Sequence, residues 1–180
     1  MNILLDNPIK LFFLCVSLLF SILLFSVALL LPYGQVPYLD GNPGIIDHSE
    51  TIETIDGPWD LFYYFGDIWC HQMHDRSFVM NGNQLPVCIR CFGIFLGIPI
   101  GFFISYLVKI PVTQTLHRKI ISVLLFGGVP IVIDGGFQLL GIWESTPFSR
   151  IFTGLLGGAA AGLLLAILLD VIMISLKTDR

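Results

Sequence analysis

The chain has 180 residues and a formal net charge of −4, with 55% hydrophobic and only 12% charged residues, and its mean hydropathy is +0.84. A water-soluble core of this size cannot hide so much apolar surface. The composition therefore excludes an ordinary soluble globular protein and predicts an integral membrane protein. With an acidic balance and nine Lys and Arg residues, we expect no nucleic-acid partner.

Four apolar segments approach the roughly 20 helical residues that a bilayer crossing requires. In chain order they are 11–31, 94–108, 120–140 and 151–176. The first is longer than the apolar core of a signal peptide and has no small-x-small cleavage site before Pro32, so we expect a retained anchor that starts the mature protein at residue 1. The second is short for a crossing but longer than a typical re-entrant segment.

These segments predict an all-α integral membrane bundle of about four transmembrane helices with a Cys/His-rich extramembrane cap. By composition the chain divides into an N-terminal anchor helix (1–31), an extracytoplasmic loop with a Cys/His/Arg cap (32–91) and a three-helix membrane core (92–180).

The orientation in the cell membrane follows from the basic residues, which are retained on the cytoplasmic side. We expect cytoplasmic N- and C-termini, because this arrangement places six of the nine basic residues inside, namely Lys10, Lys109, Arg118, Lys119, Lys177 and Arg180.

Residues 32–59 carry five acids and neither Lys nor Arg. We interpret them as a solvated acidic loop rather than a calcium site, because the alternating spacing of oxygen ligands in a calcium loop is missing. Residues 59–70, WDLFYYFGDIWC, predict a short helix at the membrane surface, where Trp and Tyr are favoured. That helix delivers Cys70 to the interface.

The segment 70–93 gathers three of the four cysteines and two of the four histidines. Cys88 and Cys91 form a Cys-x-x-Cys pair, and Cys70 with His71 or His74 completes a set of sulfur and nitrogen ligands suited to zinc. Such a set leaves no obvious position for a bound water and predicts a structural site.

Two other interpretations of the cysteines stay open. In an oxidising compartment the pair forms an exchange-active disulfide, with Arg90 between the thiols lowering their pKa, or the thiols are simply packed apolar side chains. Any disulfide leaves one odd thiol among the three, which favours a shared metal. Cys15, in the middle of the first apolar segment, is expected to be inert.

Three short motifs together carry a resemblance, namely Cys70-His71-Gln72, Arg76-Ser77-Phe78 and LPVCIRCFG at 85–93. They resemble the signature of a family of small prokaryotic multi-pass membrane proteins classed as a domain of unknown function, and Arg150, Thr153 and Gly154 also match it. The likeness spans residues from roughly 60 to the end of the last apolar segment. It implies that Cys-His-Gln and Cys-x-Arg-Cys are hallmarks, which favours His71 over His74, and it implies no established activity.

Ionisable residues inside apolar segments usually face the protein interior and carry function. Asp134 and Gln138 are four apart and share one helix face. With Glu144, Arg150 and the pair Arg76 and Arg90 they suggest a polar cavity with a guanidinium-rich mouth suited to phosphate or carboxylate. The alternative is a structural network in which Asp134 pairs with Arg150 or Arg90.

Two function classes remain open, and the sequence does not decide whether the chain is an enzyme. The first is an enzyme acting on a lipid head group or a phosphate-bearing amphiphile. The pattern of Asp134, Gln138 and Arg150 before a Gly-rich last segment is loosely similar to membrane enzymes of the teicoplanin-resistance type. In this first class the catalytic residues would be Asp134, His71 and Gln138, and the substrate-binding residues Arg76, Arg90 and Arg150. The second is a non-catalytic membrane protein whose metal or disulfide knot stabilises a cap for assembly or transport.

Small residues predict close packing of the membrane helices. The partner helices could belong to the same chain or to a second copy in a homo-oligomer, and the sequence leaves this open. Glycines recur in the second and last apolar segments as small-x-x-x-small patterns, namely Gly93, Gly97, Gly101, Gly154, Gly157, Gly158 and Gly162. Asp170, near the inner end of the last segment, is expected to pair helices or to lie at the interface.

Overall fold

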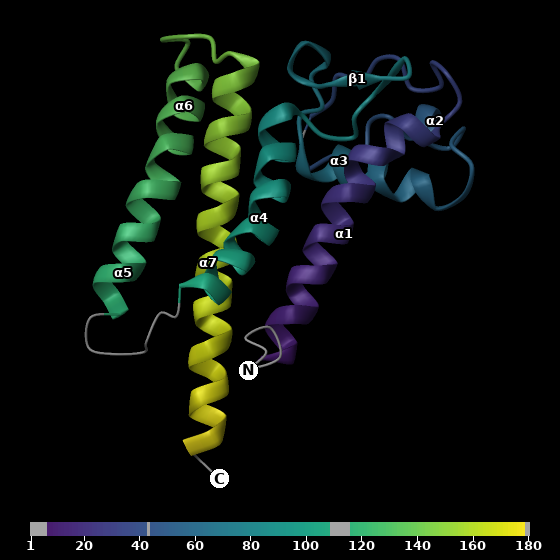
Figure 1. The fold of residues 1–180 in the computed structure, drawn as a ribbon. Helices are drawn as coiled ribbons and strands as arrows, with labels where there is room; N and C mark the ends of the chain where they lie inside the picture. Colours follow the sequence, from purple (N-terminus) through teal and green to yellow (C-terminus); the bar gives the residue numbers. More distant parts are fainter. Residues whose placement is uncertain (1–6, 43, 109–115, 179–180) are drawn as a thin grey trace. The chain divides into compact units, whose positions relative to one another are not determined.

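The computed structural model describes residues 7–42, 44–108 and 116–178. Within these residues the chain is mostly helical (Figure 1). Four helical stretches are long and apolar enough to cross a membrane, as predicted: Pro8–Leu30, Ile89–Leu107, Leu116–Leu139 and Pro147–Leu176. The chain divides into two compact units, which we call the helical unit (1–19 and 93–180) and the cap unit (20–92).

The first and last long helices begin with the same local device. Helix α1 (Pro8–Leu30) is preceded by Asn7, whose side-chain oxygen accepts the N–H of Lys10 at 3.2 Å. Helix α7 (Pro147–Thr178) is preceded by Thr146, whose hydroxyl oxygen accepts the N–H of Ser149 at 3.1 Å. In both, a proline fills the first helical position, where no N–H is needed.

In the helical unit, α4 (Ile89–Leu107) packs against α7 at the predicted glycines. A Cβ added to Gly97 would lie 2.4 Å from the carbonyl oxygen of Leu155, and one added to Gly158 would lie 2.0 Å from that of Ile94. Only glycine leaves room for backbones this close.

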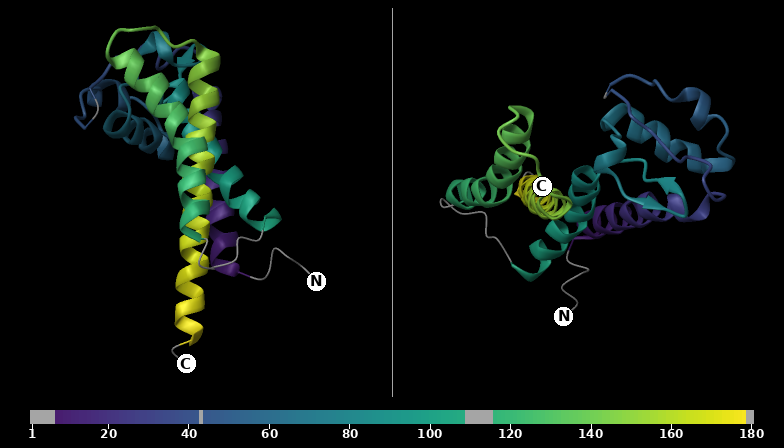
Figure 2. Two further views of the ribbon diagram at one scale, coloured as in Figure 1. Left: turned by 90° about the vertical axis from the view of Figure 1, so that its left-hand side faces the viewer. Right: turned by 90° about the horizontal axis from the view of Figure 1, so that it is seen from above.

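The third crossing is one continuous helix made of α5 (Leu116–Val123), the π-helical turn η4 (Leu124–Gly128) and α6 (Val129–Leu139). Both views in Figure 2 show it beside α7, and a Cβ on Gly127 would lie 2.3 Å from the Cβ of Ala160. The helix ends at Leu139, and Gly141 follows with a φ of +68°. The N–H of Gly141 donates to the carbonyl of Gln138 and that of Ile142 to the carbonyl of Phe137, as is common after a helix end.

Asp170 joins helices, as the sequence predicted. Its carboxylate accepts from the ammonium of Lys10 at 2.9 Å and from the side-chain amide of Asn7 at 3.1 Å. Lys10 is 5% exposed and lies 4.9 Å from the ring centre of Tyr106. The pair therefore ties the start of α1 to α7 and α4.

The cap unit contains the remaining short elements: α2 (Ser49–Ile52), η2 (Gly57–Trp59), α3 (Asp60–Trp69), η3 (His74–Arg76), β1 (Val79–Met80) and β2 (Asn83–Gln84). The helix expected at 59–70 is thus present as α3. The antiparallel hairpin of β1 and β2 was not predicted. It turns at Asn81 and Gly82, both with positive φ, as a two-residue Asn-Gly turn requires.

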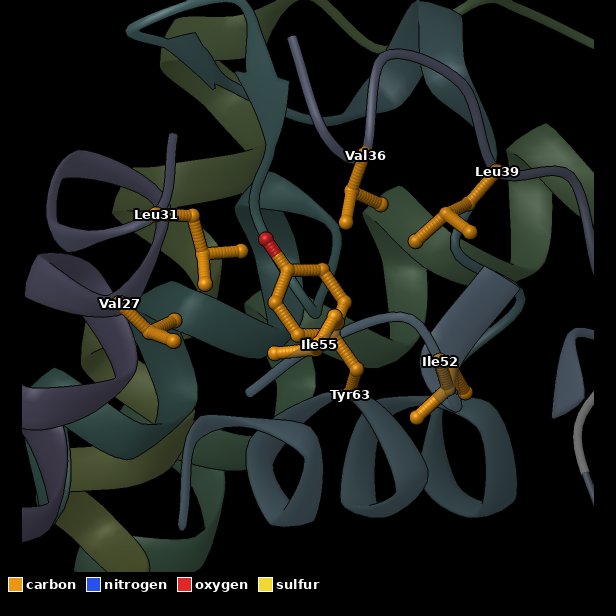
Figure 3. Packing of buried hydrophobic residues seen from close by; sticks show 7 residues of the cluster. All are labelled: Val27, Leu31, Val36, Leu39, Ile52, Ile55 and Tyr63. Atoms are coloured by element: carbon orange, nitrogen blue, oxygen red, sulfur yellow. The ribbon is translucent and has the colours of Figure 1, made fainter. Parts of the chain in front are cut away.

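An apolar core and the two buried amides of Asn83 and Gln84 hold the cap unit together. Figure 3 shows the core side chains arranged around the ring of Tyr63, namely Val27, Leu31, Val36, Leu39, Ile52 and Ile55. The amide oxygens of Asn83 and Gln84 accept the N–H groups of Val36 at 2.8 Å and Leu39 at 2.9 Å. The Tyr63 hydroxyl donates to the carbonyl of Gln84 at 2.8 Å, and burial raises the pKa of Tyr63.

Candidate functional site

The cap unit brings three cysteines together. Cys70 follows α3, Cys88 precedes α4 and Cys91 lies in the first turn of α4. Their sulfur atoms all lie within 4.8 Å of one another, and the N–H of Cys88 donates to the Sγ of Cys70 at 3.2 Å. None of the three is in a disulfide. This geometry allows one metal ion to contact all three sulfurs.

The segment that ends at Cys70 and the segment that leads to Cys88 come close together because of Gly66 and Gln72. A Cβ on Gly66 would lie far too close to the carbonyl oxygen of Pro86, at 1.8 Å. The side chain of Gln72 is fully buried and donates to the carbonyl of Pro86 at 2.8 Å, while the backbone carbonyl of Gln72 accepts from the side chain of Gln84. Gln72 has a φ of +45°. The Gln of the Cys-His-Gln motif thus acts as a structural tie between the segments that carry Cys70 and Cys88.

Local hydrogen bonds favour a thiolate at Cys88. Thiol hydrogen bonds from Cys70 and Cys91, together with the backbone N–H groups of Cys91 and Arg90, lower the pKa of Cys88 even though burial opposes this. The hydrogen bond with Cys88 raises the pKa of Cys70, and burial adds to the effect. Amide N–H groups at a helix start stabilise negative charge, so the surroundings favour one thiolate, at Cys88.

Neither candidate histidine belongs to the three-sulfur group. The side chain of His71 is exposed. His74 Nδ1 lies 2.9 Å from the amide oxygen of Gln84, and its ring stacks on Tyr38 with 5.0 Å between the ring centres. The assignment of His71 as a ligand, or as a catalytic base, therefore stays a prediction.

The sequence analysis missed a second cluster, formed by Asp47, His48 and Asp67. The buried carboxylate of Asp67 accepts the N–H groups of Asp47 and His48, both at 3.1 Å, and lies 2.8 Å from Nδ1 of His48. Nε2 of His48 accepts the N–H of Asp40 at 3.3 Å. These bonds attach the 40–48 loop to α3, so we assign the cluster a structural role.

A signal for this cluster was present in the sequence. Tyr63, Gly66, Asp67 and Cys70 follow the i, i+3, i+4, i+7 spacing of one helix face, and all four are buried. A carboxylate on the buried face of a short aromatic helix requires polar partners. Of the acids in the loop, Asp47 alone contributes to the cluster.

In the helical unit, Asp134 is 3% exposed and lies beside a groove of about 420 Å³. The hydroxyl of Thr153 lies 3.4 Å from its carboxylate. The hydroxyl of Ser145 lies 3.4 Å from the backbone carbonyl oxygen of Asp134 and 3.2 Å from the amide oxygen of Gln138. Apart from Asp134, Thr153 and Ser149, the groove is lined by apolar side chains, namely Leu125, Phe126, Val129, Pro130, Ile133 and Trp143.

The three arginines that the sequence assigned to substrate binding are divided between the units. Arg150 is 7% exposed, on α7. Arg76 and Arg90 are half-buried in the cap unit; Arg76 lies 3.7 Å from Asp75, and Arg90 lies between Cys88 and Cys91 in the first turn of α4. Their shared role in one phosphate site stays a prediction.

Comparisons with known proteins agree with a membrane protein. The model of a family described as "Predicted membrane protein (DUF2085)" matches residues 70–164. An uncharacterized protein of Methanothermobacter thermautotrophicus is 38% identical over 104 residues, 58% of this chain and 90% of the relative. One of Methanocaldococcus jannaschii is 37% identical over 89 residues, 49% of this chain and 56% of that protein. No solved structure matches the chain.

Proposed function

Because the chain belongs to the predicted membrane-protein family DUF2085, we propose that it is a multi-pass membrane protein whose Cys70, Cys88 and Cys91 bind one zinc ion. The observation that carries this proposal is the convergence of three sulfurs within 4.8 Å from two segments of the chain. The ion would join the end of α3 to the start of α4 and stabilise the cap unit.

The donor set suits zinc in two respects. Thiolate sulfur is a preferred ligand of Zn²⁺, and a Cys-x-x-Cys pair at a helix start is a frequent half of such sites. Backbone N–H groups directed at ligand sulfur, as from Cys88 to Cys70, offset the negative charge that the thiolates bring. The competing interpretation is a disulfide between two of the three thiols, with the third left over.

The proposed orientation places both termini in the cytoplasm and the cap unit outside. It is supported by the excess of basic residues at the termini and in the 109–119 segment. In that orientation the cysteines meet an oxidising compartment, and a bound metal would protect them as thiolates.

Stability measurements on cysteine variants test the zinc site. Ala changes at Cys70, Cys88 and Cys91 should lower the unfolding temperature by similar amounts, and a double change should add little to a single one, because each removes the same bound ion. A chelator should bring the wild type to the level of these variants. Cys15→Ala is the matched control, with an ordinary small effect. Additive losses that chelation does not change would contradict the zinc site.

A second candidate function has one observation in its favour, the groove beside Asp134. Its apolar walls suit a hydrocarbon chain, and a buried carboxylate inside a membrane segment is a candidate general base. The corresponding activity would be on a lipid head group or phosphate-bearing amphiphile, with Asp134 and Gln138 at the reacting group and Arg150 at the phosphate.

An activity assay with matched carboxylate variants tests this second function. Purified wild-type protein should convert at least one member of a panel of phospholipids and polyprenyl phosphates. Asp134→Asn should abolish that conversion while keeping helical content, and Asp170→Asn, which is remote from the groove residues in sequence and pairs with Lys10, should retain it. An inactive wild type, or an active Asp134→Asn protein, would contradict the enzyme function.

A further inference from the structure

The three-sulfur group provides fewer ligands than zinc normally takes. Zn²⁺ in proteins is usually four-coordinate; structural sites supply all four ligands, whereas catalytic sites supply three and keep one position open. Among the residues that the structure describes, the group comprises Cys70, Cys88 and Cys91 and no His, Asp or Glu. The ligand count is therefore that of an open site.

The backbone explains why the adjacent histidine does not complete the set. Cys70 is extended, with φ −138° and ψ 148°, and successive side chains of an extended backbone point in opposite directions. Cys70 is accordingly buried and His71 exposed. Both flanks of His71 are fixed, since the N–H of Cys70 donates to Gly66 at 2.8 Å and Gln72 is held at Pro86. The backbone carbonyl of His71 accepts the N–H of Gly41 at 3.1 Å.

The surroundings of the group favour a soft, anionic ligand. Cys70 is 1% exposed, whereas Cys88 and Cys91 are half-buried, so a ligand would reach the group from the side of these two residues. The start of α4 carries the positive end of its helix dipole, which favours negative charge there. Arg90 adds a cationic residue within the same turn. A metal already held by three sulfurs matches a further sulfur donor.

We infer that the metal at Cys70, Cys88 and Cys91 keeps its fourth coordination position for an exogenous small thiol, which binds as the thiolate. The thiol gives its proton to solvent, its sulfur forms the bond to the metal, and a water leaves; no oxidation or reduction takes place. This inference rests on the proposed metal site and adds the class of ligand that the site takes.

Cobalt substitution tests the inference in the full-length protein in detergent. In the Cys15→Ala background, one equivalent of Co²⁺ should give a sulfur-to-cobalt charge-transfer band and tetrahedral ligand-field bands. Adding 2-mercaptoethanol should raise the charge-transfer intensity by about one third, because a fourth thiolate joins three, with the cobalt still bound after gel filtration. His71→Ala should respond as its parent does, and acetate at the same concentration should not.

Each outcome bears on a different statement. No charge-transfer band with Co²⁺ contradicts the metal site itself. A band that 2-mercaptoethanol leaves unchanged contradicts the open position. A response that appears only in His71→Ala shows that His71 holds the fourth position and overturns the inference, while the zinc proposal stands. A response to acetate but not to 2-mercaptoethanol refutes the assignment of the ligand as a thiol.

Discussion

The contact between α4 and α7 allows a substitution whose effect follows directly from the coordinates. In Gly158→Ala, the new Cβ would lie 2.0 Å from the carbonyl oxygen of Ile94 and 2.8 Å from its carbonyl carbon. Both atoms belong to a helix backbone, so no side-chain rotation relieves the clash. Gly136→Ala is the matched control, because a Cβ there meets nothing within 4 Å.

The size of the effect can be worked out from these distances. Real Cβ atoms essentially never come closer than 3.0 Å to such an atom, so the two backbones must separate by roughly 1 Å in a close-packed interface. Overpacking of this kind costs about 1–3 kcal/mol, and the separation also weakens the neighbouring contacts at Gly97 and Gly162. We therefore expect Gly158→Ala to lose about 3 kcal/mol and Gly136→Ala to be neutral or slightly more stable.

The assay is reversible unfolding in mixed detergent micelles with increasing dodecyl sulfate, followed by circular dichroism. Gly158→Ala should unfold at a clearly lower mole fraction of dodecyl sulfate than Gly136→Ala. Equal midpoints for the two variants would refute close backbone packing of α4 on α7.

Two further predictions concern the ion pair and the orientation. Asp170→Leu strands the buried Lys10 and should cost about 3 kcal/mol in the same assay, whereas the double change Lys10→Met/Asp170→Leu should recover much of it; a double variant no more stable than Asp170→Leu would argue against a pair that merely joins helices. With the native cysteines blocked or replaced, Glu53→Cys should react with an impermeant thiol reagent in intact cells and His117→Cys should not; the reverse pattern would invert the proposed orientation.

The membrane helices could be predicted from sequence because apolar length is a local property. The ends of the predicted segments differ from those of the helices for local reasons too. The second crossing begins at Ile89, because the Cys-x-x-Cys turn is itself the first turn of α4. The last begins at Pro147, where Thr146 caps the helix.

The hairpin escaped prediction even though its turn signal was present. Asn81-Gly82 is the strongest short-range hairpin signal, but the two strands have only two residues each, which is too short to show alternation of polar and apolar side chains.

The interior of the cap could not be predicted from local sequence. Asn83 and Gln84 are polar residues in a polar stretch, and their type alone favours exposure. They are buried because they bond to the backbone of Val36 and Leu39, 47 and 45 residues away. Such pairing depends on the tertiary fold.

The candidate site shows the same division between local and tertiary information. The Cys88–Cys91 pair was evident from its spacing, and Cys70 was expected to join it. The direction of His71 depends on the extended backbone of Cys70 and on the fixed position of Gln72. Neither is encoded in the motif itself, so the sequence pattern could not show on which side of the backbone His71 lies.

The central claim is that Cys70, Cys88 and Cys91 form one metal site, and elemental analysis combined with thiol counting tests it most directly. Protein purified without chelators or reductant should contain one zinc per chain and, after denaturation with a chelator, all four cysteines as free thiols. Metal-free protein with two free thiols and one disulfide would contradict the account.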